Sequence, residues 1–428
     1  MIDVIIIGAG YGGMSAAALL ANAGKRVLVL DAASVIGGRA HTFRDDEGFM
    51  WEYGAHSHRL REKGIANEVF KRLGEEIEFI PESGDAKLIF KDQLWDRPEG
   101  PLRFLTTPML SFTARITFIR LMLKLKKAEA AKWYDKTLID FYHTWFSNVE
   151  VEQFLSFIGM TIMCPDPYKV SAGEVIDFMQ RFFAARIGVG EPVGGSAQLF
   201  GKLKKFVEKN GEIHLDEKVT EILHENGQIK GVATQLSNYQ ATKVIFAARL
   251  PLLFEVADKK MFPENIVSYS NSIENSSGLS IDFVTDRPVT DIKGSLLGVD
   301  IPIWAKFQSN SDNSFTPAGT FLSTWGIMLP WGFNGEQAIV DQTENRLKRL
   351  ITKLFPDILS HLVKERKLVV PVMNANVLTP RQSKPHRPSV TSETLSGLFF
   401  VGDTVQGDGC SGDISFSSAM KAVDIILG

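Results

Sequence analysis

The chain has 428 residues, of which 44% are hydrophobic and 23% charged, and its formal net charge is -3. Because this length is more than one hydrophobic core normally serves, we expect two domains, and the near-neutral balance is not that of a nucleic-acid binder or a disordered tail. The two cysteines, Cys164 and Cys410, exclude a disulfide framework and a zinc cluster.

The N-terminus begins with a buried-strand pattern at residues 3–7 that runs directly into a glycine turn. This pattern leaves no room for a signal or transit peptide. No run of about 18 uncharged apolar residues occurs that would form a transmembrane helix. We therefore expect a cytoplasmic protein.

An apolar strand at 4–7, a glycine turn and a helix of small residues at 14–23 follow one another. In the turn, Gly8 permits a tight bend, Gly10 lets the backbone approach a pyrophosphate, and Gly13 lets the helix pack close to the strand. The pyrophosphate is expected at the helix N-terminus. The turn comprises Gly8, Ala9, Gly10, Tyr11, Gly12 and Gly13.

The unit closes with a second strand. Gly24 is typical of a helix end, and the strand at 26–30 leads to Asp31, an acidic residue placed to hydrogen-bond a ribose hydroxyl. Together these features predict a Rossmann-type dinucleotide site. They do not separate NAD from FAD, because both present the same adenosine diphosphate end.

Two segments after Asp31 carry a resemblance. Residues 32–42, with Gly38 and Arg39, resemble the GG-R/K-x-x-T segment of the flavin amine oxidase and phytoene desaturase superfamily. The resemblance implies a close backbone approach at Gly38 and an Arg39 side chain that faces phosphate. Residues 51–56 are similar to the family stretch that runs along the flavin ring, which implies contacts from Gly54, Ala55 and His56.

The C-terminal segment 397–403 is similar to the family strand whose Gly-Asp pair, here Gly402 and Asp403, places a carboxylate on the ribityl chain. NAD has no ribityl group, so the resemblance implies FAD. A glycine-rich loop then leads into a helix expected at 416–427. In the family, the backbone N–H groups at this helix start face the flavin edge that gains negative charge on reduction. The matching residues are Gly412, Asp413 and Ile414.

The middle of the chain completes the resemblance. Residues 192–199 precede a helix, and the following segment ends at Val219, whose backbone pairs with the adenine in the family. A hairpin at 227–232 and a strand at 243–248 follow. The implied fold is α/β: a Rossmann-type FAD-binding domain, glutathione-reductase-like, interleaved with a mixed-sheet and helical substrate domain.

The order of these segments predicts discontinuous domains. The FAD-binding domain is expected from 1–80, 189–258 and 376–428, and the substrate-binding domain from 81–188 and 259–375. Apolar residues at i, i+3, i+4 and i+7, beginning at Leu138, indicate helices in the first insert. The second insert is expected to be largely strands, with a helix at the segment 336–354. Its predicted strands are 278–284, 304–307 and 320–325.

Flavin chemistry needs few protein groups, because the cofactor carries the hard step. His56 is the candidate polar group near the ring, with a purely packing role as the equal alternative. His56 and His58 alternate along an extended segment, which disfavours a shared metal. Monoamine oxidases attach flavin to a cysteine before the C-terminal motif, whereas Cys410 follows it, so non-covalent FAD is expected. Lys306 could correspond to the flavin-facing lysine of polyamine oxidases, but the residues around it match that family poorly.

The segment 110–127 mixes apolar and basic residues so that, on a helix, basic side chains flank an apolar face. It is interpreted either as a helix in peripheral contact with a membrane, drawing in a lipid-soluble substrate, or as a solvated cap of the substrate domain.

Taken with the resemblance, these features favour an enzyme similar to phytoene desaturases, which transfers hydride between FAD and a small apolar organic substrate of the isoprenoid kind. A flavin amine oxidase or a protoporphyrinogen oxidase-like enzyme is the alternative. A non-redox isomerase, a structural flavin protein and a nicotinamide dehydrogenase are alternatives of other classes. The sequence does not define the electron acceptor.

Overall fold

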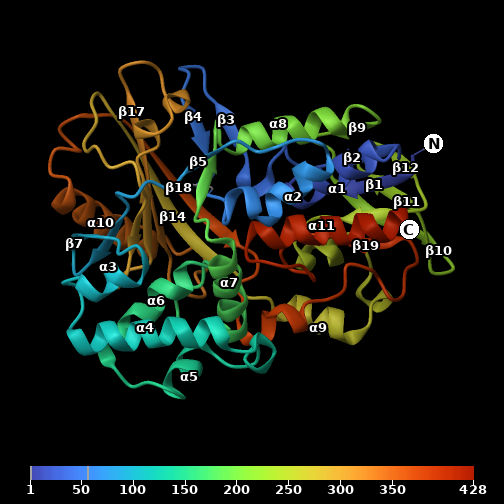
Figure 1. Ribbon diagram of the computed structural model, residues 1–428. Helices are drawn as coiled ribbons and strands as arrows, with labels where there is room; N and C mark the ends of the chain where they lie inside the picture. The colour runs from blue at the N-terminus through green and yellow to red at the C-terminus, as the bar shows by residue number, and fades with distance from the viewer. Residues whose placement is uncertain (1, 55–56) are drawn as a thin grey trace.

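The computed structural model describes residues 2–54 and 57–428. A five-stranded parallel sheet with the order β19-β13-β1-β2-β9 forms the end of the molecule that carries both termini (Figure 1). The β1 and β2 strands are buried throughout, as expected for parallel strands covered on both faces. The strands are β1 (Val4–Ile7), β2 (Val27–Leu30), β9 (Gly211–His214), β13 (Val244–Phe246) and β19 (Leu398–Phe400).

Four helices accompany this sheet, and the predicted helix of small residues is confirmed as α1. Its alanines and glycines are buried, which lets α8 and α11 pack against it. The last helix, α11, begins at Gly412 rather than at Phe416, because the glycine-rich loop turns directly into it. The helices are α1 (Tyr11–Asn22), α2 (Ile65–Arg72), α8 (Gly195–Val207) and α11 (Gly412–Leu427).

Smaller strands lie beside this unit. The predicted hairpin is confirmed, with its turn at Asn226 and Gly227, as part of the antiparallel sheet β10-β11-β12. The α9 helix (Glu264–Ser272) buries Ile266 and Tyr269 in the same core as the parallel sheet. The strands are β10 (Val219–Glu225), β11 (Gln228–Thr234), β12 (Asn238–Gln240), and the pairs β3 (Thr42–Arg44) with β4 (Met50–Glu52) and β5 (Phe79–Pro81) with β8 (Gly190–Pro192).

A mixed seven-stranded sheet, with the order β18-β14-β17-β16-β15-β6-β7, forms the other end of the molecule. Only the pairing of β15 with β6 is parallel among its described pairs. One face packs on α10 (Gln337–Leu354), which confirms the helix predicted at 336–354. The strands are β6 (Lys87–Phe90), β7 (Gln93–Asp96), β14 (Ser276–Thr285), β15 (Leu296–Gly298), β16 (Ile303–Lys306), β17 (Phe321–Met328) and β18 (Leu362–Asn374).

The helices of the first insert lie below and beside this sheet in Figure 1. The prediction of helices in the first insert is right from Gly100 onward but wrong for 87–96, which forms β6 and β7. Leu88, Ile89 and Phe90 are all buried, and such a continuous apolar run has no period that distinguishes a strand from a buried helix. The helices are α3 (Gly100–Thr106), α4 (Phe112–Lys127), α5 (Leu138–His143), α6 (Val149–Met160) and α7 (Ala172–Ala185).

Candidate active site

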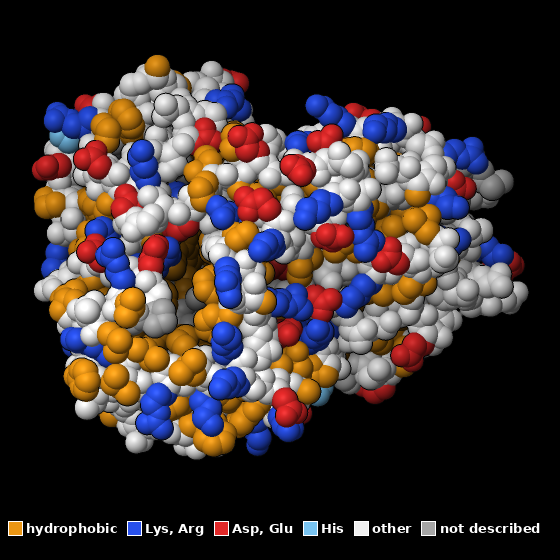
Figure 2. Space-filling view, viewed as in Figure 1, with side chains coloured by type: hydrophobic (Ala, Val, Ile, Leu, Met, Phe, Trp, Pro, Cys, Tyr) orange, Lys and Arg blue, Asp and Glu red, His pale blue; other side chains and the backbone are white. Residues whose placement is uncertain are grey.

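A cavity of about 1430 Å³ lies between the two sheets. One end is bounded by the glycine turn before α1, by Arg39 and by Asp403, and the other by the seven-stranded sheet with α4, α6 and α7. Figure 2 shows a hollow on this face of the molecule, bordered by apolar side chains. Two chemically different ends therefore share one space.

The glycine turn fits a dinucleotide. A Cβ on Gly10 would meet no atom within 4 Å, so the backbone here borders open space, and Gly8, Gly10, Tyr11 and Gly12 all line the cavity. No side chain caps the N-terminus of α1, which leaves backbone N–H groups directed at the cavity. Such an N-terminus attracts the phosphates of a bound nucleotide.

Close packing explains the remaining glycines of the turn. A Cβ on Gly13 would lie 1.9 Å from the Gly8 carbonyl oxygen, and a Cβ on Gly12 would lie 2.7 Å from Cγ1 of Val401. Gly8 itself has a φ of +110°, a conformation that favours glycine. Gly13 does not line the cavity, and its position matches the packing role expected of it.

Asp31 lies at the end of β2 and lines the cavity. Its two carboxylate oxygens accept hydrogen bonds from the backbone N–H groups of Ala9, at 2.6 Å, and Ala33, at 2.8 Å. These bonds fix the carboxylate beside the glycine turn. Each carboxylate oxygen has a second lone pair with which it can accept a bond from a ribose hydroxyl.

Arg39 and Asp403 come together from opposite ends of the chain. Nη2 of Arg39 lies 2.8 Å from Oδ2 of Asp403, and the backbone N–H of Ala375 donates to the same oxygen at 3.2 Å. Gly38 and Gly402 also line the cavity. The sequence predicted a site role for Gly38, Arg39, Gly402 and Asp403 but contained no sign that Arg39 and Asp403 pair.

The segment expected along the flavin ring is described in part. Gly54 lines the cavity, whereas Ala55 and His56 lie outside the described residues. The nearby His58 is buried, and its ring meets the Tyr11 ring edge-on with centroids 5.9 Å apart. His58 therefore packs beside the glycine turn.

The start of α11 reaches the cavity through Gly412 and Asp413, and desolvation raises the pKa of the half-buried Asp413 carboxyl. Ile414, expected at the same edge, does not line the cavity and packs in the helical core. Its N–H donates to the Ser411 carbonyl at 3.2 Å. Val219 begins β10 and is buried, likewise outside the cavity lining.

Glu52 is a half-buried acid that the sequence did not single out. Burial raises its pKa to about 7, and the backbone N–H of Ser196 donates to it at 3.0 Å. The hydroxyl of Tyr11 donates to Oγ of Ser196 at 2.9 Å, so the glycine turn, α8 and β4 share one polar network. The sequence did contain a signal for a desolvated acid, since Glu52 lies between the aromatic residues Trp51 and Tyr53.

Lys306 and Glu191 face the cavity from β16 and β8 and form an ion pair with 3.8 Å between Nζ and Oε1. Burial raises the pKa of Glu191, although the positive charge of Lys306 opposes this shift. Leu60 and Arg61, which also line the cavity, both have positive φ, and Nε of Arg61 is buried. The polar part of the wall is therefore built from side chains far apart in sequence.

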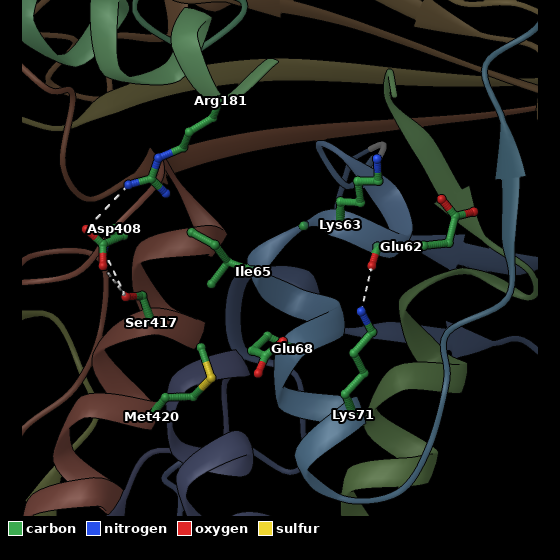
Figure 3. Close-up of a pocket in the computed structure, with 10 residues that line it drawn as sticks. Glu62, Lys63, Ile65, Glu68, Lys71, Arg181, Asp408, Ser417 and Met420 are labelled. Atoms are coloured by element: carbon green, nitrogen blue, oxygen red, sulfur yellow. Dashed lines mark hydrogen bonds and ion pairs between the residues drawn. The ribbon is translucent and has the colours of Figure 1, made fainter. Parts of the chain in front are cut away.

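A second, more polar pocket of about 450 Å³ lies between α2, α7 and α11. Figure 3 shows the Asp408 carboxylate between Arg181 and Ser417, with a contact to each of them. Burial opposes ionisation of Asp408, but Lys384, Lys421 and Arg181 together hold its pKa below the usual range. These contacts clamp the glycine-rich loop that leads to α11.

The two sheets and the cavity between them define a protein that binds a dinucleotide at one end of the cavity. The other end of the same cavity is apolar. The family model for flavin containing amine oxidoreductase matches residues 11–427. The chain belongs to this family: it is an FAD-dependent oxidoreductase. The predicted family, fold class, enzyme class and cofactor are confirmed.

Individual relatives are distant. An L-amino-acid oxidase of Sistrurus catenatus edwardsii is 24% identical, with 78% of this chain and 66% of the relative covered. A 15-cis-phytoene desaturase of Solanum lycopersicum is 23% identical over 100% of this chain and 79% of the relative. The crystal structure of an oxidoreductase from Methanosarcina mazei has a TM-score of 0.81 at 20% identity, covering 99% of this chain and 100% of that one.

The chain thus spans about two thirds of the length of the L-amino-acid oxidase, 66%. A desaturase and an amino-acid oxidase match at nearly equal identity, so the comparisons define the family and the cofactor without defining the substrate.

Proposed function

We propose that the protein transfers hydride between FAD and a small apolar organic substrate of the isoprenoid kind. The observation that carries the proposal is the apolar wall of the cavity beyond the nucleotide end. A wall of this kind binds carbon chains and excludes water. Its apolar side chains include Phe104, Phe118, Met122, Phe157, Phe178, Met179, Phe182, Phe183, Leu297 and Trp304.

Bound FAD would supply the hydride acceptor or donor, its N5 atom. The chain's own residues have simpler tasks. The N-terminus of α1 and Asp31 are proposed to hold the adenosine diphosphate end, and Arg39 and Asp403 to hold the middle of the cofactor. The FAD roles of Ala55, His56, Val219, Gly412, Asp413 and Ile414 likewise remain proposals.

An amine substrate is the second candidate. It is favoured by Glu191 and Glu82, two carboxyl groups in the cavity wall, because an ammonium group pairs with carboxylates. Lys306 already neutralises Glu191, however, and Ser295 donates to Glu82 at 2.5 Å from its N–H and at 2.8 Å from its hydroxyl. These partners leave less unpaired negative charge to bind an ammonium group. The apolar substrate is preferred for this reason.

The route of entry is proposed to be a membrane surface. The helix α4 carries an outward apolar stripe at Phe112, Ile116 and Leu123, and Leu123 also lines the cavity. Exposed Arg120, Lys124 and Lys127 flank the stripe, and Figure 2 shows apolar and basic side chains gathered over this region. The stripe suits the acyl region of a bilayer and the basic residues suit anionic headgroups.

Co-sedimentation with phosphatidylglycerol vesicles tests the entry route. Replacing Phe112, Ile116 and Leu123 together by serine should release the protein from the vesicles. Leu236→Ser, which alters a similarly exposed side chain at the other end of the molecule, should leave binding unchanged. Equal binding by both variants, or no binding by the wild type, would contradict the route. Among the described residues no helix is long and apolar enough to cross a membrane.

The function itself is tested by anaerobic reduction of the FAD-loaded protein with an isoprenoid extract and, separately, with a panel of amines. Loss of the oxidised-flavin absorbance with the extract supports the proposed reaction in the direction of substrate oxidation. Loss with an amine alone replaces it with the second candidate. Reoxidation of chemically reduced protein by the extract supports the opposite direction, and the electron acceptor follows from which oxidant restores the spectrum.

A further inference from the structure

A flat aromatic side chain lies on the cavity face of the seven-stranded sheet. Trp304 of β16 is in register with Gly326 of β17, and Gly326 is in register with Ser280 of β14. The three residues therefore form one row across three neighbouring strands. Side chains in such a row point to the same face of a sheet.

Two glycines make room for the indole. A Cβ on Gly326 would lie 2.1 Å from both Cε2 and Cζ2 of Trp304, and a Cβ on Gly278 would lie 3.7 Å from Cη2. The ring of Trp304 thus extends over Gly326 toward Gly278, against the sheet backbone. Any larger residue at 326 would push the ring off the sheet. Since Trp304, Gly278 and Ser280 all line the cavity, the exposed face of the indole borders the cavity space.

The end of the row carries a buried hydroxyl. Ser280 is 2% exposed, and its Oγ has no hydrogen-bond partner within the part of the chain that the structure describes. Its neighbours Leu279 and Ile281 pack on the opposite face of the sheet, so Ser280 points to the cavity side. A buried hydroxyl without a partner is unfavourable, and a ligand oxygen at this position would remove that penalty.

We propose that Trp304 and Ser280 form a binding subsite for a flat, unsaturated group that bears a hydroxyl or carbonyl oxygen. The flat group stacks on the indole, and the oxygen exchanges a hydrogen bond with Oγ of Ser280. This subsite rests on the proposed function, because it takes the apolar cavity to be the substrate cavity. It narrows the substrate class from any apolar chain to one that carries an oxygen next to a planar segment.

The test uses two flat probes that differ in one hydroxyl, 2-naphthol and naphthalene. Their dissociation constants for the FAD-loaded protein are measured by equilibrium dialysis. The wild type should bind 2-naphthol about fivefold more tightly, the effect of one hydrogen bond. Ser280→Ala should remove this preference and leave naphthalene binding unchanged. Equal binding of the two probes by the wild type, or a preference that survives Ser280→Ala, would overturn the subsite.

The stacking role of the Trp304 indole, here called the platform, is tested with Gly326→Ala. The added methyl group tips the indole off the sheet and into the cavity. Both probes should bind about tenfold more weakly, since a stacked aromatic contact contributes about 0.5–1.5 kcal/mol. Gly201→Ala in α8 is the matched control, because a Cβ on Gly201 meets no atom within 4 Å. FAD content shows whether each variant is folded. Trp304→Ala provides the same test if Gly326→Ala does not fold, and unchanged probe binding would overturn the platform.

Failure of the subsite and failure of the proposed function give different results. If the probes behave as expected but no isoprenoid or amine exchanges electrons with the flavin, the subsite stands and the proposed reaction fails. If an isoprenoid reduces the flavin but the variants leave probe binding unchanged, the reaction stands and the subsite fails.

Discussion

The two ends of the cavity are built in different ways. The nucleotide end depends on backbone geometry: the glycines before α1 give an open approach at Gly10 and a close contact at Gly13. The substrate end depends on side chains brought together from α4, α7, β14 and β16. A requirement on the backbone restricts residue type at fixed spacing, whereas an apolar wall can be made by many residues in many orders. The first end should therefore tolerate substitution poorly and the second should tolerate it well.

The largest effect is expected at Gly13. In Gly13→Ala the new Cβ would lie 1.9 Å from the Gly8 carbonyl oxygen, and a backbone atom cannot move aside as a flexible side chain can. We expect a loss of more than about 4 kcal/mol in the free energy of unfolding, together with loss of FAD. Urea denaturation and flavin content measure both quantities. If the Gly13→Ala protein binds FAD fully and is as stable as the wild type, the nucleotide end is not less tolerant of substitution than the substrate end.

A smaller effect is expected at Glu52 of β4, which accepts a hydrogen bond from the first turn of α8. Its pKa is raised from 4.5 to about 7, so the folded state holds this proton more tightly than the unfolded state does. Its contribution to stability is therefore fully present below pH 4.5 and is lost as the pH rises through 7.

In Glu52→Gln this pH dependence should disappear. The variant should match the wild type at low pH and exceed it by about 3 kcal/mol above neutrality, since the pKa is raised from 4.5 to about 7 and each pKa unit corresponds to about 1.4 kcal/mol. The difference between the two proteins in unfolding free energy, followed across pH, isolates Glu52 from the other carboxylates. A constant difference at all pH values would show that Glu52 does not titrate in this window.

The smallest effect is expected at Arg39, whose side chain is partly exposed and pairs with Asp403. Arg39→Ala should raise the dissociation constant of FAD about tenfold through the loss of charge-assisted hydrogen bonds, without altering the fold. Arg346→Ala, which removes an exposed arginine on α10, is the control. Fluorescence titration of the FAD-free protein measures both constants. Equal constants for the two variants would place Arg39 outside the cofactor site.

Sequence alone gave the elements of the nucleotide end because each has a local signal. The strand, the glycine turn and Asp31 fall within the first 31 residues, and Gly402 and Asp403 resemble a known motif. The pairing of Arg39 with Asp403 has no local signal, since 364 positions separate the two residues.

The substrate end was less accessible for the same reason. The first insert is predicted to be helical, but 87–96 forms β6 and β7, because the buried run of β6 has no period that distinguishes a strand from a helix. The row formed by Trp304, Gly326 and Ser280 depends on the register of three strands, which a single sequence does not reveal. Apolar and aromatic residues in the inserts indicated a core, and only the fold separates those that line the cavity from those that fill it.

The most direct test of the central claim is the absorption spectrum of the purified, FAD-loaded protein under anaerobic conditions, recorded before and after addition of an oxygen-bearing isoprenoid fraction. The proposed function predicts electron exchange with this fraction: bleaching of the oxidised flavin, or reoxidation of flavin that was first reduced chemically. A flavin that the isoprenoid fraction leaves unchanged in both oxidation states, but that an amine reduces, would contradict it.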